Sequence, residues 1–183
     1  DSFFLSLILL RKPGQFVDRK IFIGVGSNMG QSDKNCIMAI KMISGDFRVN
    51  LRSVSSFYTT SPVSNIEQGD FINCAIEIDW NGTPMELLQF LNGIEASMGR
   101  VRGKKNGPRI IDLDILLYGS KIVNEDMLTI PHKELHRRKF AILPCLEIEP
   151  DLVLTKPLAS FLSEIGDDQK VTRLEHIAFS EDD

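Results

Sequence analysis

The chain has 183 residues, of which 43% are hydrophobic, so it can bury one sizeable core and we expect a single globular domain. Its net charge of -4 and pI near 5.4 argue against a general binder of nucleic acids or membrane surfaces, because no net positive field attracts a polyanion. Its three cysteines are scattered and form no C-x-x-C pair, which argues against a zinc or redox motif and favours packing roles in a reducing compartment, the cytoplasm.

The chain starts with an apolar run, FFLSLILL, at residues 3–10. Eight residues fall far short of the roughly 20 that cross a bilayer, and the basic residues follow the run instead of preceding it, so it is a poor signal peptide. Because the first residue is Asp1 and not Met, we expect residues 1–19 to be a remnant of a longer polypeptide or a trimmed leader, which would indicate an organelle. An extra edge strand or a short docking segment is an equally good interpretation.

The next residues alternate between strand and helix patterns. Residues 20–28, KIFIGVGSN, predict a strand that ends in a tight turn. Ser32 or Asp33 is then expected to cap a helix in which isoleucines recur every three residues. Residues 47–58 are a strand candidate because they are rich in Val, Ser and aromatic residues, and residues 71–80 because their polarity alternates. A loop joins them.

A second helix has a complete start signal. Thr83 is the expected N-cap, Pro84 the first helical residue, and Glu86 completes a capping box. Apolar residues follow at spacings of four, three and four as far as Met98, which predicts one buried stripe, and Gly99 ends the helix. Several connections between strands are too short for parallel crossovers, so we predict an α+β sandwich with helices packed on a largely antiparallel sheet.

Fewer elements are expected after residue 110. A strand is expected at residues 110–118, and residues 121–124, KIVN, are expected to pair back as a short strand. Residues 131–151 predict a proline-led turn and a short helix, and the tail from Leu152 carries no motif.

Two carboxylates, Asp112 and Asp114, lie inside the apolar strand pattern RIIDLDILLY. Side chains of a strand alternate between faces, so both point the same way, with Cα atoms roughly 6.6 Å apart. Such a pair repels unless cations lie between, and magnesium with phosphate oxygens would supply them. The alternative is a strand with one wet face, and for an isolated D-x-D motif that interpretation is the more common one.

Basic residues on both sides of this strand favour the metal interpretation. Residues 99–109 contain five basic residues and three glycines, so this loop can fold over a polyphosphate. Downstream, His132, Arg137 and Arg138 add further donors. Each feature alone is usually an ordinary solvated loop or a structural histidine, but their coincidence around one strand suggests phosphoryl transfer from a nucleotide.

The sequence also resembles a known family, the 6-hydroxymethyl-7,8-dihydropterin pyrophosphokinases of folate biosynthesis. The resemblance runs in order from about Lys20 to Asp151 and is carried by FIGVGSN at 22–28, SSFYTTSPV at 55–63, FINCAIEI at 71–78, GPRIIDLDILLYG at 107–119 and IPH at 130–132. It implies a ferredoxin-like α+β fold, with a pyrophosphokinase domain at residues 20–183. It also implies that ATP donates its terminal pyrophosphate to the pterin hydroxymethyl oxygen and releases AMP.

The resemblance assigns roles to individual positions. Asp112 and Asp114 match the ligands of two magnesium ions that bridge the ATP phosphates, and Arg100 and Arg109 match arginines that bind phosphate. Positions that match nucleotide or phosphate contacts are Asn92, Glu95, His132 and Arg138. Independently, Glu95 lies beside the apolar stripe of its helix and not on the solvent face.

The pterin requires a flat aromatic slot with fixed donors and acceptors. Phe71 and Phe140 match the two stacking aromatics of the family, although plain core residues are an alternative reading. Asn73 falls on the same strand face as Phe71, so its amide can complement both edges of the ring. Thr60 and Val63 match residues that contact the pterin.

The sequence departs from the family at three positions. Asn106 stands where a tryptophan often precedes Gly-Pro-Arg, so the closing contact of the loop loses stacking area. Lys133 stands where an aromatic residue occurs, and Phe71 where tyrosine is common. None of these changes affects the two aspartates.

Two other functions are alternatives, and only the first would use the two aspartates. A nucleotidyltransferase would leave AMP on its substrate, and an RNA-binding module would present a basic, aromatic sheet face instead of two acids. We expect ATP and the hydroxymethyl pterin as partners, with no nucleic acid and no membrane. ATP and magnesium should bind first, because the basic loop can close productively only over a loaded site. The sequence leaves open whether the chain is fused to, or cooperates with, other folate-pathway enzymes.

Overall fold

The computed structural model describes residues 20–62, 67–101 and 107–180. Its centre is an antiparallel sheet in the order β5-β1-β4-β3-β8, in which β2 also pairs with β4. The strands are β1 (Ile21–Ser27), β2 (Val49–Val54), β3 (Phe57–Thr60), β4 (Phe71–Trp80), β5 (Asp112–Tyr118) and β8 (Val171–Leu174). The predicted antiparallel α+β architecture is confirmed.

β2 and β3 are two halves of one interrupted strand, since both pair with β4. The sheet order therefore reads β5-β1-β4-β2/β3, the order of a ferredoxin-like fold. The single strand predicted at residues 47–58 is interrupted at Ser55 and Ser56. The Ser55 backbone N–H still donates to the Ala75 carbonyl at 2.9 Å, but it is the Ser55 hydroxyl that accepts the Ala75 N–H, also at 2.9 Å. The side chain replaces a backbone acceptor at the break.

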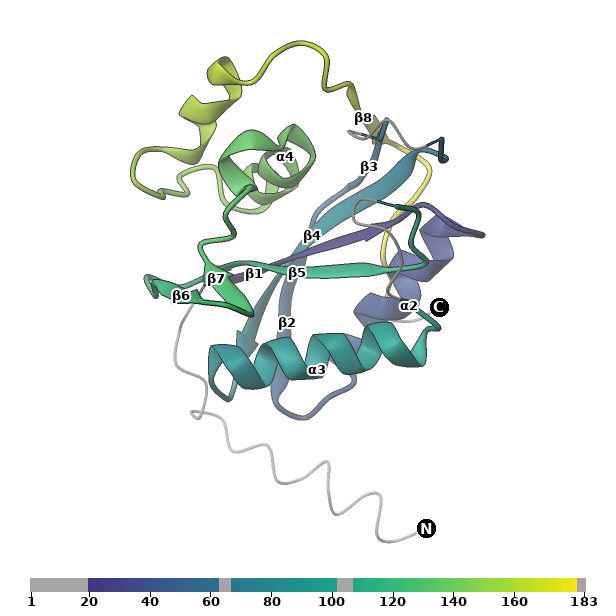
Figure 1. Ribbon diagram of the computed structural model, residues 1–183, viewed down its shortest axis with the longest axis vertical. Helices are drawn as coiled ribbons and strands as arrows, with labels where there is room; N and C mark the ends of the chain where they lie inside the picture. Colours follow the sequence, from purple (N-terminus) through teal and green to yellow (C-terminus); the bar gives the residue numbers. More distant parts are fainter. Residues whose placement is uncertain (1–19, 63–66, 102–106, 181–183) are drawn as a thin grey trace, which may run out of the picture.

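Helices cover both faces of the sheet (Figure 1). On one face lie α2 (Ser32–Ser44) and α3 (Pro84–Ser97), and on the other α4 (Lys139–Ile148) with the 3-10 helices η1 (Leu135–Arg137) and η2 (Leu158–Glu164). Alternation along the strands fills two cores. In β1, Ile21 and Ile23 belong to the α2–α3 core, whereas Phe22 belongs to the α4 core. The three cysteines are free and buried.

The two helix-start predictions have different outcomes. The capping box of α3 is confirmed, with Thr83 and Glu86 bonding each other's backbone N–H groups. The predicted cap of α2 is wrong, because Ser32 is already helical and Gln31 occupies the cap position without a side-chain bond. Asn35 ties this helix to the end of β1 instead, through its amide bonds to the Ser27 hydroxyl and the Met29 carbonyl.

The segment at residues 121–124 does not pair back on the preceding strand. Instead β6 (Val123–Glu125) and β7 (Leu128–Ile130) form a separate hairpin, because the chain reverses at the turn between them. The chain then returns to the sheet where the His132 N–H donates to the Leu116 carbonyl at 2.9 Å. Among the described residues, no helix is long and apolar enough to cross a membrane.

Candidate active site

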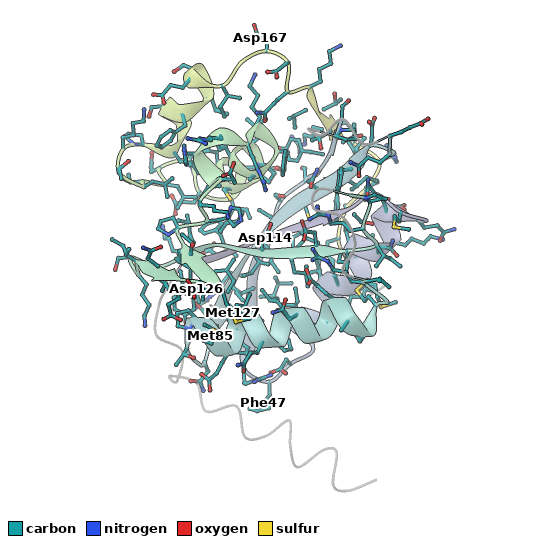
Figure 2. All side chains as sticks on the ribbon, in the orientation of Figure 1. Phe47, Met85, Asp114, Asp126, Met127 and Asp167 are labelled. Atoms are coloured by element: carbon teal, nitrogen blue, oxygen red, sulfur yellow. The ribbon has the colours of Figure 1, made fainter. Side chains whose placement is uncertain are left out.

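A cavity of about 610 Å³ lies on the α4 face of the sheet. Its floor includes residues of β1, β4 and β5, and its other wall is formed by residues 132–141. Asp112 and Asp114 both line it, while Leu113 points to the opposite core, as the strand periodicity predicts. Figure 2 shows Asp114 at the centre of the molecule, between the sheet and α4.

Glycine in β1 makes room for this floor. A Cβ atom on Gly26 would lie 2.7 Å from the Asn73 amide oxygen, and one on Gly24 would crowd the Leu116 side chain at 3.3 Å. Any larger residue at Gly26 would displace Asn73, so the glycine allows the amide of β4 to lie against the backbone of β1.

Asp112 lies between two arginines. Its Oδ1 pairs with the Arg100 Nη1 at 2.7 Å, and its Oδ2 with the Arg109 Nη1 at 2.6 Å. Burial alone would lower the pKa of Arg100, but the Asp112 and Glu95 carboxylates outweigh it and the pKa is raised. The structure therefore brings together Asp112, predicted to bind magnesium, and the two arginines predicted to bind phosphate. Both carboxylates beside Arg100 favour its charged form.

Glu95 lies behind the cavity wall. It is 6% exposed, pairs with Arg100, and its Oε1 accepts the backbone N–H of Leu113 at 2.7 Å. Burial raises the pKa of Glu95, and the bonds from Leu113 and Arg100 oppose that rise. Since Leu113 separates the two aspartates, Glu95 joins α3 to the centre of the acidic strand. Asn92, on the same helix, does not line the cavity.

Asp114 faces His132 across a separation of 4.0 Å between Oδ2 and Nε2. The other ring nitrogen, Nδ1, accepts the Glu134 backbone N–H at 3.2 Å, so the neutral ring carries its proton on Nε2, toward the carboxylate. Burial raises the pKa of Asp114, and repulsion from Asp112 adds to this rise. Burial lowers the pKa of His132. Asp114 on the floor of the cavity and His132 on the opposite wall therefore face each other, with the ring N–H directed toward the carboxyl group.

The aromatic end of the cavity is formed by two elements. Phe71 lines it from β4 and Phe140 from α4. Asn73 also lines it and donates to the Thr60 hydroxyl at 2.9 Å, so Thr60 lies behind Asn73 and away from the cavity. The Arg138 guanidinium lies over the Phe140 ring, 5.7 Å from its centroid. Val63 and Asn106 lie outside the described residues.

A family model covers the part of the chain that forms this cavity. The family model of 7,8-dihydro-6-hydroxymethylpterin-pyrophosphokinase matches residues 22–150, which include every described residue of the candidate site except Gln169. The chain belongs to this family. It is similar to the pyrophosphokinase of Haemophilus influenzae, with 40% identity over 144 residues, 79% of this chain and 89% of that protein.

Other relatives of this pyrophosphokinase chain are longer. The mitochondrial folate synthesis bifunctional protein of Pisum sativum is 36% identical over 154 residues, which cover 83% of this chain but 29% of that protein. A crystal structure of a Plasmodium falciparum HPPK-DHPS matches with a TM-score of 0.63 and 12% identity, and covers 83% of this chain and 46% of that one. That likeness shows the shared fold.

Several residues of the pyrophosphokinase cavity were not assigned from the sequence. Glu134 adjoins predicted positions, and the two glycines of β1 fall in the GVGSN stretch, so proximity to these motifs could have indicated them. Arg137, expected as a further donor, and Lys133, expected only as a departure from the family, also line the cavity. Gln68 lies in the loop before Phe71. Gln169 comes from the tail that carries no motif, and only the folded structure brings it to the cavity.

Proposed function

We propose that this chain transfers the terminal pyrophosphate of ATP to the hydroxymethyl oxygen of 6-hydroxymethyl-7,8-dihydropterin and releases AMP. One observation carries the proposal: a single cavity on one face of the sheet is lined by two carboxylates of β5 with two arginines, and by two aromatic rings from β4 and α4. Strand β1 lies between β5 and β4, so the charged end and the aromatic end are on different strands. The charged end suits a magnesium-bound triphosphate, and the aromatic end suits a flat bicyclic ring.

Asp112 and Asp114 fit magnesium that is shared with a substrate. In the described part of the chain, no group of three or more His, Cys, Asp or Glu residues is arranged to hold a metal. Magnesium usually takes one or two protein carboxylates and completes its shell with water and phosphate oxygens. We assign the two aspartates to two magnesium ions that ATP brings, and these ions, when bound, would neutralise charge at the attacked β-phosphorus.

The arginines act by position and charge. Arg100 is held by Asp112 and Glu95, and Arg109 by Asp112, so both guanidinium groups are fixed before substrate binds. Each guanidinium has five N–H donors, so donors remain for phosphate oxygens. His132 and Arg138 approach from the opposite wall of the cavity. Fixed donors of this kind lower the barrier by electrostatic stabilisation, without reorganisation during the reaction.

The pterin would lie between Phe71 and Phe140, with Asn73 at its edge. Because the Asn73 Nδ2 already donates to Thr60, the orientation of the amide is set before the ring arrives. A preset amide distinguishes donor from acceptor positions on the ring, which gives specificity beyond stacking.

The decisive experiment measures AMP from ATP, magnesium and the hydroxymethyl pterin. We expect free AMP from the unmodified chain and a loss on the order of 100-fold or more in Asp112→Asn and Asp114→Asn, because each carboxylate would stabilise transition-state charge through magnesium. Asp126→Asn is the matched control, since Asp126 lies at the exposed tip of the β6–β7 hairpin (Figure 2). Full turnover in both active-site variants would contradict the metal assignment, and AMP bound to the pterin would indicate a nucleotidyltransferase.

A further inference from the structure

The C-terminal segment reaches the cavity although it lies beyond the stretch that matches the family. It is anchored at two places: η2 packs Leu158 and Phe161 into the α4 core, and β8 adds an edge strand to β3. The turn between η2 and β8 carries Asp167, labelled at the top of Figure 2. Two residues later, Gln169 lines the cavity.

The Gln169 side chain bonds the backbone on both sides of Arg138. Its Oε1 accepts the Lys139 N–H at 3.0 Å, and its Nε2 donates to the Arg137 carbonyl at 2.8 Å. Both polar groups of the amide are used, and they contact the residues immediately before and after Arg138. The two bonds therefore restrain the backbone of Arg138 from a distant part of the chain.

Arg138 needs such restraint because of its place in the fold. It is the N-cap residue of α4, has an extended backbone with φ −122° and ψ 103°, and makes no side-chain cap bond. The first N–H groups of a helix have no partner within the helix. Gln169 supplies the acceptor for the first of them, that of Lys139, so it replaces the missing cap.

The restrained residue faces the substrates. Arg138 lines the cavity, and its guanidinium lies over the ring of Phe140, two positions along α4. A rotation of the backbone at Arg138 would therefore move its positive charge relative to this ring and to the cavity. Small displacements of positioning groups are costly in reactions that depend on fixed geometry.

We propose that Gln169 is a positioning residue for Arg138 and that it sets the affinity of the cavity for the triphosphate. The inference rests on the proposed function, in which Arg138 contacts nucleotide phosphate. It adds a residue outside the matched stretch, delivered to the site by the anchored segment between η2 and β8.

The test measures binding of a non-transferable ATP analogue with magnesium by calorimetric titration. Gln169→Met keeps the length of the side chain and removes both bonds, and we expect the dissociation constant to rise ~5-fold, the factor that one typical hydrogen bond contributes. Lys170→Met is the matched control in the same turn, because Lys170 is exposed and does not line the cavity. It should leave the affinity within twofold.

A double-mutant cycle separates positioning from a merely structural role. If Gln169 acts through Arg138, Gln169→Met should have no further effect on affinity in an Arg138→Met background. An equal loss in both backgrounds, or no loss in the single variant, would overturn the proposal. This binding measurement does not depend on turnover. If the unmodified chain binds the analogue but makes no AMP with the pterin, the proposed function fails, and the same titrations still decide the role of Gln169.

Discussion

Asn28 and Arg109 exchange two hydrogen bonds across 81 residues of sequence. The Arg109 N–H donates to the Asn28 Oδ1 at 2.8 Å, and the Asn28 N–H donates to the Arg109 carbonyl at 3.2 Å. The Asn28 Nδ2 also donates to the Gln68 Oε1 at 2.9 Å and to the Gly69 carbonyl at 3.1 Å. The Asn28 side chain thus connects the segment of Arg109, which we propose binds phosphate, to the loop that leads into Phe71.

Substitutions of Asn28 should separate these two connections. Asn28→Asp keeps the acceptor for the Arg109 N–H but loses both donors, so we expect a higher KM for the pterin and little change for ATP. Asn28→Ala loses all three side-chain bonds and should raise both KM values and lower stability by about 1–3 kcal/mol. Steady-state kinetics with each substrate varied in turn provides the measurement. If Asn28→Asp and Asn28→Ala change the KM values for ATP and for the pterin equally, the two connections do not act separately.

The Glu95→Gln variant should separate the contribution of Glu95 to stability from its contribution to activity. The pKa of Glu95 is raised above its ordinary value of 4.5 by burial, so its contribution to stability is greatest at low pH and declines as the pH rises through the folded-state pKa. Glutamine keeps an oxygen for the Leu113 N–H and removes the buried charge. We expect unfolding free energy at pH 7 to change by under about 1 kcal/mol and the part of its pH dependence due to Glu95 to disappear.

Activity of the same variant should fall about tenfold, since Arg100 loses one of the two charges that fix it. Urea unfolding at pH 5 and pH 7 gives the stability, and AMP release gives the activity. A large stability loss with undiminished turnover would reverse the assigned role of Glu95.

The aromatic end can be tested with a shape-matched pair of variants. Phe71→Tyr keeps the ring and should leave the pterin KM within about twofold, whereas Phe71→Leu keeps apolar bulk without the ring and should raise it roughly five- to tenfold, the value of an aromatic pair. The KM for ATP should change little in either. If Leu and Tyr behave alike, Phe71 contributes bulk to the cavity wall and not stacking.

The hydrogen bonds of Glu147 predict that the contact between α4 and β3 weakens in acid. It accepts the Ser56 N–H at 3.0 Å, the Ser56 hydroxyl at 2.7 Å and the Tyr58 hydroxyl at 2.8 Å. Burial acts to raise the pKa of Glu147, but these bonds outweigh it and the pKa lies below its ordinary value of 4.5. The stabilisation is therefore present above that value and lost as the pH falls through the folded-state pKa.

Glu147→Gln should lower the unfolding free energy by about 1–2 kcal/mol at pH 7, because charged acceptors form the stronger bonds. The difference from the unmodified chain should shrink as the pH falls below the ordinary value of 4.5 and through the folded-state pKa, which unfolding curves at several pH values would measure. Turnover at neutral pH should stay within about twofold, since Glu147 does not line the cavity. A difference that is constant with pH would show that the lowered pKa does not contribute to stability.

Local sequence patterns predicted the elements whose causes are local. The capping box at Thr83 and the alternation of Asp112, Leu113 and Asp114 depend on neighbours a few residues away, and both are confirmed. The break at Ser55 was not predicted, because its cause is a hydrogen bond to Ala75, 20 residues later. The β6–β7 hairpin was placed wrongly because its short strands could pair with either neighbour.

The sequence by itself determined the family, through its motifs. It also determined that the two aspartates share a face, because side chains of a strand alternate between faces whatever surrounds the strand. Only the tertiary structure decided that Asp112 meets Arg100, that His132 faces Asp114, and that Gln169 reaches Arg137 and Lys139. These contacts join segments separated along the chain, and their distances are set by how the helices pack on the sheet, which no local pattern encodes.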